Sequence, residues 1–157
     1  MTRDEIILRV TELSRRREVH WKDDQKLHHF AAKIQDVSDD VVFDALISFF
    51  HSLPASNHKF NEQECAGTLL ALRRPSPETE LDRIICETLG YWDVSVEQLP
   101  WYLALVFGRE KFREAVRRLQ RDEHLSKREA GALDTFLYWT VVSEARMVEE
   151  LQLNQDI

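Results

Sequence analysis

Apolar residues in this chain recur at intervals of three and four residues, the spacing that places them on one face of an α-helix. The clearest case is a single stripe made by Leu81, Ile84, Ile85, Thr88, Leu89 and Trp92. No segment shows the alternation of apolar and polar residues that is typical of a half-buried strand. We therefore predict an all-α fold, because a helical pattern of apolar residues cannot bury its face as a strand.

Capping residues, prolines and glycines predict where the helices begin and end. Ser38, Asn61 and Ser76 are expected as N-caps, and Pro100 as a first helical residue. Gly108 is expected to end one helix and to precede the next. We expect one helical turn over 95–98 and helices over residues 3–16, 21–36, 39–53, 62–74, 77–92, 100–107, 109–119 and 126–153.

Length and composition limit the organisation of the chain. It has 157 residues, few glycines and no Gly-, Ser- or Pro-rich linker, so we expect one helical domain over residues 1–157. The formal net charge of −7 argues against general binding to nucleic acid or to anionic membranes. The longest uncharged run, 98–108, is too short to cross a bilayer. Cys65 and Cys86 lack paired spacing, which indicates reduced thiols and a cytoplasmic protein.

The order and length of the helices over about 39–153 resemble a short HEAT-like or armadillo-like array. Within it, Pro100 lies in a first helix and Phe112 in a second, with a tight turn between them. Gly108 stands at that turn, where the HEAT family usually has an aspartate. The resemblance implies antiparallel helix pairs that stack into an extended surface. The alternative is an irregular helical bundle of about seven or eight helices.

The region from Tyr91 to Leu119 contains the densest aromatic cluster and the most basic helix. Arginines recur there every four residues as a cationic ridge made of Arg109, Arg113, Arg117 and Arg121. One interpretation is a solvated helix face whose arginine stems cover apolar surface. The other is a docking ridge for an acidic partner.

Aromatic residues occur as three adjacent pairs, Tyr91-Trp92, Trp101-Tyr102 and Tyr138-Trp139. Neighbours on a helix point about 100° apart, so the two rings of a pair cannot both bury against the same neighbouring element. Core filling explains these rings, and so does a groove or partner surface. We take Tyr91, Trp101 and Tyr102 as candidate partner-binding residues.

Glu144 falls within the apolar arc of the helix expected over 126–153. An isolated buried carboxylate is strongly unfavourable. We therefore predict a structural buried charge, paired with an arginine or histidine from a neighbouring helix.

The chain carries no recognisable catalytic or cofactor motif. His20, Asp24 and His28 would share one helix face, but no metal-binding framework such as HExxH accompanies them. Neither cysteine has a histidine nearby in the sequence, and no glycine-rich phosphate loop or GxSxG elbow occurs. We therefore expect no metal site, no cofactor and no catalytic residues.

These observations favour a small protein-interaction module with one protein partner. In size, charge and helical content it is similar in type to bacterial immunity proteins, which cover a toxin's active site. The acidic residues that could face a basic toxin are Asp39, Asp40, Glu78, Glu80, Asp82, Glu149 and Glu150. The alternative is a ligand-binding protein or an enzyme. It would use an apolar pocket around Tyr91 and Trp101, with Arg109 or Arg113 holding an anion, as HEAT-like DNA glycosylases do with DNA. Net acidity argues against DNA as the ligand.

Overall fold

The computed structural model describes residues 1–17, 24–51 and 58–153, and all regular structure in these ranges is helical. It consists of α1 (Arg3–Arg17), α2 (Gln25–Lys33), α3 (Asp39–Ile47), a 3₁₀ helix η1 (Ser48–Phe50), α4 (Lys59–Arg73), α5 (Leu81–Thr88), α6 (Gln98–Phe107), α7 (Arg109–Leu119), α8 (Lys127–Trp139) and α9 (Glu144–Leu153). The all-α prediction is confirmed. The described ranges hold nine α-helices, one more than the boundaries drawn from the sequence, because the helix expected over 126–153 is two helices.

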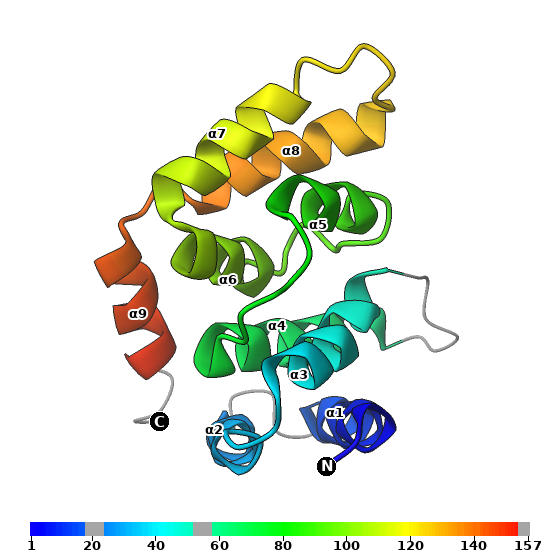
Figure 1. Cartoon of the computed structure of the whole chain (residues 1–157), viewed down its shortest axis with the longest axis vertical. Coiled ribbons are helices and arrows are strands. Elements are labelled where there is room, and N and C mark those ends of the chain that lie inside the picture. The colour runs from blue at the N-terminus through cyan, green and yellow to red at the C-terminus, as the bar shows by residue number, and fades with distance from the viewer. Residues whose placement is uncertain (18–23, 52–57, 154–157) are drawn as a thin grey trace.

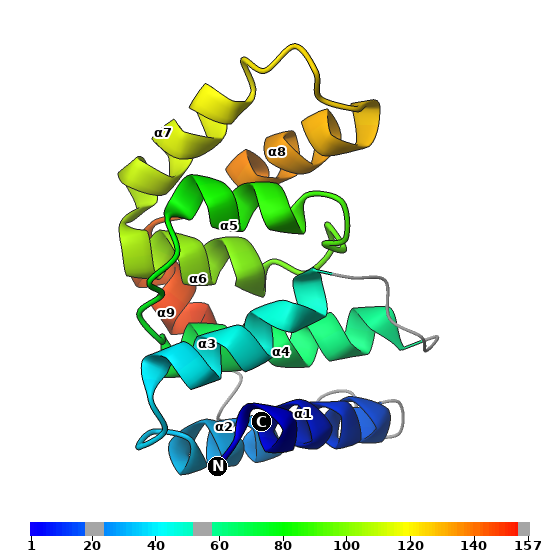
Figure 2. The same cartoon turned by 45° about the vertical axis from the view of Figure 1, so that its right-hand side comes forward.

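The helices lie in successive layers along the long axis of the molecule (Figures 1 and 2). α1 and α2 form one end, α3 and α4 the next layer, α5 and α6 the third, and α7 and α8 the far end. α9 runs alongside this stack and packs against α6 and α4. Layered helix pairs leave long lateral surfaces free for contact with other molecules.

Buried apolar side chains form a cluster to which every one of these helices contributes. The predicted stripe of α5 and the residues after it is confirmed, since all six of its members are at most 6% exposed. At the α7–α8 end, the ring of Trp92 stacks on Phe136 with centroids 4.1 Å apart, and Phe112 meets Phe136 edge-on. The apolar faces read from the sequence therefore meet in a common core.

α4 and α6 make the most extensive helix–helix contact of the described residues, and Gly67 lies in it. A Cβ added at this position would lie 3.0 Å from the Cβ of Gln98 and 3.4 Å from the Cγ1 of Val96. The absence of a side chain at Gly67 therefore allows the backbones of the two helices to approach.

The predicted starts of α4 and α5 are wrong, and tertiary contacts explain the start of α5. α4 begins at Lys59, before the expected N-cap Asn61. α5 begins only at Leu81, because the preceding segment is held by side chains from other elements. The backbone N–H of Ser76 donates to Asp39 at 2.9 Å, and the hydroxyl of Tyr102 donates to the carbonyl oxygen of Pro75 at 2.6 Å.

α6 begins at Gln98, so Pro100 is its third residue rather than its first. Proline is tolerated there because the N–H groups of the first turn have no partner within the helix. Gly108 ends α6 and precedes α7, as predicted, and its φ of 95° is one that residues with a side chain rarely adopt.

The helix expected over 126–153 is interrupted at residues 140–143. Thr140 bonds back through its hydroxyl to the carbonyl oxygen of Phe136 at 2.8 Å, and two β-branched valines follow it. The hydroxyl of Ser143 then accepts the N–H of Arg146 at 3.1 Å, which caps the start of α9. The interruption leaves the last carbonyl groups of α8 without helical partners.

Candidate interaction surfaces

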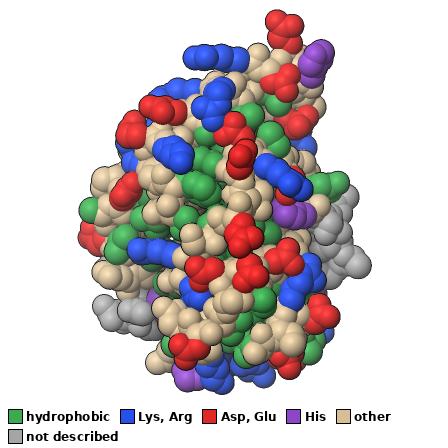
Figure 3. Space-filling view, viewed as in Figure 1, with side chains coloured by type: hydrophobic (Ala, Val, Ile, Leu, Met, Phe, Trp, Pro, Cys, Tyr) green, Lys and Arg blue, Asp and Glu red, His purple; other side chains and the backbone are tan. Residues whose placement is uncertain are grey.

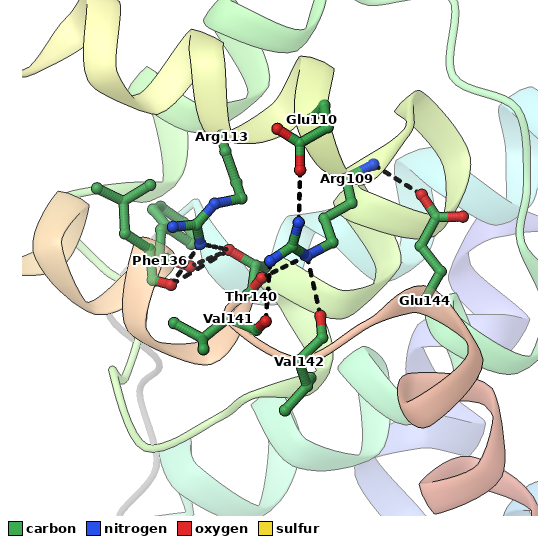
Figure 4. A network of polar contacts seen from close by, with 9 residues as sticks. Arg109, Glu110, Arg113, Phe136, Thr140, Val141, Val142 and Glu144 are labelled. Carbon is green, nitrogen blue, oxygen red and sulfur yellow. Dashed lines mark hydrogen bonds and ion pairs between the residues drawn. The ribbon is translucent and has the colours of Figure 1, made fainter.

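Arg109 donates hydrogen bonds to the segment that follows α8. Its Nε donates to the carbonyl oxygens of Thr140 and Val142 at 2.9 and 3.0 Å, and a terminal nitrogen donates to that of Val141 at 2.8 Å (Figure 4). The other terminal nitrogen pairs with the carboxylate of Glu110. One guanidinium therefore joins the start of α7 to the connection between α8 and α9.

Arg113, one helical turn further along α7, binds the same helix end. It donates to the carbonyl oxygen of Leu137 at 2.7 Å and to the hydroxyl of Thr140 at 3.0 Å. Burial lowers the pKa of Arg113 below its ordinary value, and the charges of Arg109 and Arg117 act in the same direction. A cation at the C-terminus of a helix is favoured by the helix dipole, which offsets part of this cost.

The four arginines therefore do not form one exposed ridge. Arg109 and Arg113 turn toward α8, whereas Arg117 and Arg121 are exposed and make no ion pair with the described residues. Arg118 was not among the predicted residues. One of its terminal nitrogens donates to both carboxylate oxygens of Asp82, at 2.7 and 2.9 Å. The four arginines differ because only Arg109 and Arg113 lie beside the end of α8.

The prediction that Glu144 is buried is wrong. Glu144 is the first residue of α9 and is exposed. Its carboxylate accepts the backbone N–H of Arg109 at 2.8 Å, at the start of α7 (Figure 4). An acidic side chain bonded to the free N–H of a helix start is stabilising. The error arose because an uninterrupted helix would have turned this residue inward.

In each aromatic pair one ring is more buried than the other, as expected. Tyr102 is fully buried and its hydroxyl is bonded to a main-chain carbonyl, so this ring is not available to a partner. Burial raises the pKa of Tyr102 above its ordinary value. Tyr91 is 37% exposed, and the half-buried Trp101 donates its indole N–H to the carbonyl oxygen of Trp139 at 3.0 Å.

The aromatic pocket considered in the alternative reading is small. Trp101 lines a cavity of about 40 Å³ together with side chains of α2, α4 and α9, and Tyr91 is not part of its lining. Burial raises the pKa of Glu97 in the same cavity, assisted by the charges of Glu64 and Glu150. A space of this size is suited to water molecules, since small-molecule sites have volumes of about 300–1,000 Å³.

The acidic residues named above form three clusters along the chain, 39–40, 78–82 and 149–150, which differ in how far they are neutralised within the protein. Asp82 is bound by Arg118, and Glu149 and Glu150 are both bound by Arg146 at 3.3 and 2.5 Å. In the remaining cluster, Arg73 neutralises Asp39 at 2.9 Å. The acidic residues of these clusters that make no ion pair with the described residues are Asp40, Glu78 and Glu80.

Two of these acidic residues, Asp40 and Glu78, line a hollow of about 340 Å³ between α3 and the segment that leads to α5. Asp40, Asp44 and Glu78 supply its carboxylates, and Val41 and the nearly buried Phe43 supply apolar surface. Acidic side chains gather over this part of the molecule in Figure 3. We call this site the acidic hollow.

Hydrogen bonds favour the ionised form of Asp40 in the acidic hollow and of its neighbour Asp39. A hydrogen bond from Ser38 lowers the pKa of Asp40, and the backbone N–H of Ser76 lowers the pKa of the adjacent Asp39. Arg3 also lines the hollow and donates to Asp44 at 2.6 Å, which neutralises one carboxylate and leaves a net negative charge.

Sequence reasoning identified Asp40 and Glu78 but missed Asp44 and the apolar residues between them. Asp40 and Asp44 are four residues apart on α3, a spacing that places them on one helix face and was available as a signal. Their approach to Glu78 depends on the path of residues 75–80, which are not helical, and no local pattern indicates that path.

No three His, Cys, Asp or Glu side chains in the described part of the chain are grouped so that they could hold a metal ion, and His20 of the predicted face lies outside it. None of the described helices combines the length and the apolar character needed to cross a bilayer. Compared with known protein families, curated proteins and solved structures, the chain matches none.

Proposed function

We propose that this chain is a cytoplasmic protein-binding module whose acidic hollow receives a basic side chain of one protein partner. The observation that carries the proposal is the acidic hollow itself, with unpaired carboxylates around an apolar centre. The aliphatic stem of a lysine or arginine packs on surfaces such as those of Val41 and Phe43. Its charged end then pairs with carboxylates at Asp40 and Glu78, and an arginine can do so through two parallel hydrogen bonds.

The charge of the whole chain supports a basic partner. A formal net charge of −7 attracts a positively charged protein at long range and raises the rate of association at low salt. Immunity proteins that neutralise a basic toxin domain are the class of protein that this combination fits. The cytoplasmic assignment is supported by the free thiols of Cys65 and Cys86.

A charge-neutralising variant tests the acidic hollow. Asp40→Asn with Glu78→Gln removes the unpaired charges and preserves side-chain size. The matched control, Glu114→Gln with Glu123→Gln, changes the net charge equally at exposed positions that make no ion pair with the described residues. Each protein is used at full length to isolate a stoichiometric partner from the native host, and the dissociation constant is then measured with the purified partner.

We expect the wild-type protein and the control to bind one basic partner with similar affinity, and more weakly as salt increases. The variant of the acidic hollow should bind at least tenfold more weakly, which corresponds to about 1.4 kcal/mol or more. If the partner is a toxin, co-expression of the wild-type protein should restore growth and the variant should not. Equal affinity of both variants, or the isolation of no stoichiometric partner, contradicts the proposal.

A further inference from the structure

A second hollow of about 400 Å³ lies between α1 and α2, at the opposite end of the molecule from α7 and α8. Its charged lining residues are all basic, whereas the protein as a whole is acidic. Lys and Arg side chains gather beside a histidine at this end in Figure 3. We call this site the basic hollow. The residues that define it are Arg9, Arg16, Lys26, His29, Phe30 and Lys33.

Helical spacing places these side chains in two rows. Arg9 and Arg16 are seven residues apart on α1, and Lys26, His29 and Lys33 follow the i, i+3, i+7 pattern on α2. Each row therefore extends over two helical turns, about 10 Å. α1 and α2 both pack on α4, which directs the two rows into one hollow with the nearly buried Phe30 between them.

Most of this positive charge has no compensating carboxylate. Arg9 pairs with Glu12 at 3.1 Å. Arg16, Lys26 and Lys33 make no ion pair with the residues that the structure describes. Three unpaired cations around one hollow repel each other, and a bound anion would remove that repulsion.

We propose that the basic hollow binds a small anion that carries two or more phosphate groups. A single phosphate group has a charge of at most roughly −2 at neutral pH, too little to balance three unpaired cations. Arg16 can bind phosphate oxygens through two parallel hydrogen bonds, and Lys26 and Lys33 add point charges from the other row. A chain of phosphate groups reaches both rows, whereas a single group reaches only part of them.

The dimensions of the basic hollow favour a small ligand over a macromolecule. Its volume of about 400 Å³ lies within the range of small-molecule sites, about 300–1,000 Å³. Nucleic acid requires basic residues along an extended track, and the acidic net charge of this chain opposes that mode of binding. This proposal does not depend on the proposed function of the acidic hollow. The two hollows lie on different parts of the surface and have opposite charge.

Inorganic tripolyphosphate is a suitable probe, applied to the full-length protein at constant ionic strength with sulfate as the comparison anion. The test variant is Arg16→Gln with Lys33→Gln. The control variant, Arg121→Gln with Lys127→Gln, changes the net charge equally at exposed sites that are also without an ion pair among the described residues. Calorimetry gives the affinity, and the rise of the melting temperature with ligand concentration provides an independent measure of binding.

We expect saturable one-to-one binding to the wild-type protein and to the control, and at least a tenfold loss of affinity in the test variant. Amide chemical shifts of the wild-type protein should change along α1 and α2 on addition of tripolyphosphate, a result that does not depend on the folding of any variant. Without ligand, the melting temperature of the test variant should depend less on salt concentration than that of the wild type. Part of the repulsion between the cations of the basic hollow has been removed in this variant.

Three results would overturn the proposal. The first is the absence of saturable tripolyphosphate binding to the wild-type protein. The second is equal binding by the test variant, or chemical-shift changes confined to other helices. The third is selective binding of a glutamate-rich peptide at the basic hollow without binding of tripolyphosphate, which would identify a protein partner there instead.

Discussion

Replacement of Gly67 by alanine tests the close contact of α4 with α6. The new Cβ would lie 3.0 Å from the Cβ of Gln98, an atom that is bonded directly to the α6 backbone and cannot rotate away. Insertion of a methyl group into a packed interior costs about 1–3 kcal/mol. The gain in helix propensity from glycine to alanine is about 1 kcal/mol. We therefore expect the Gly67→Ala variant to be less stable than the wild type, by up to about 2 kcal/mol.

Gly131→Ala is the matched control because this glycine also lies within a helix. Gly131 is exposed on α8, and a Cβ added there would meet nothing within 4 Å. The propensity gain should therefore appear alone, as a stabilisation of about 1 kcal/mol. Because the propensity gain is common to both variants, the difference between them isolates the cost of crowding at the α4–α6 contact, about 1–3 kcal/mol.

Equilibrium unfolding in urea, followed by far-ultraviolet circular dichroism, measures both changes in stability. The expected signs are opposite: Gly67→Ala lowers the midpoint and Gly131→Ala raises it. If Gly67→Ala stabilises the protein as much as Gly131→Ala does, α4 and α6 are not in close contact at this position, and the argument from Gly67 fails.

Three further predictions concern hydrogen bonds and two half-buried histidines. Arg109→Ala should lower the free energy of unfolding by about 2–3 kcal/mol, because three main-chain carbonyls lose a charged donor near the surface. The control Arg117→Ala should change it by less than about 0.5 kcal/mol, and urea unfolding of both variants measures these changes. Tyr102→Phe should cost about 1–2 kcal/mol by thermal unfolding, because a buried carbonyl oxygen loses its hydroxyl donor, and an unchanged melting temperature would contradict that bond. Burial lowers the pKa of His28 and His51, so the unfolded chain binds protons first as the pH falls below about 6.5. The urea midpoint should therefore decrease between about pH 7 and 5. Replacement of both residues by glutamine should remove this part of the pH dependence.

Local sequence patterns were sufficient for the helical class and for several elements. The stripe from Leu81 to Trp92 was predictable because a helix that buries one face requires apolar residues at that spacing. The turn at Gly108 was predictable because its positive φ strongly favours glycine. The interruption at Thr140 left a weaker signal, a run of three β-branched residues followed by a serine suited to capping.

Tertiary structure decided which charged side chains remain available for binding. By sequence, Arg109, Arg113 and Arg117 are equivalent members of one series on α7, yet only the first two lie beside the carbonyl groups at the end of α8. The acidic hollow likewise depends on Glu78 reaching α3. The sequence by itself determined that the chain is helical and which face a segment such as α5 buries, because both depend on the spacing of neighbouring residues. Only the tertiary structure decided whether each charge is neutralised or exposed, because its partner comes from a distant part of the chain.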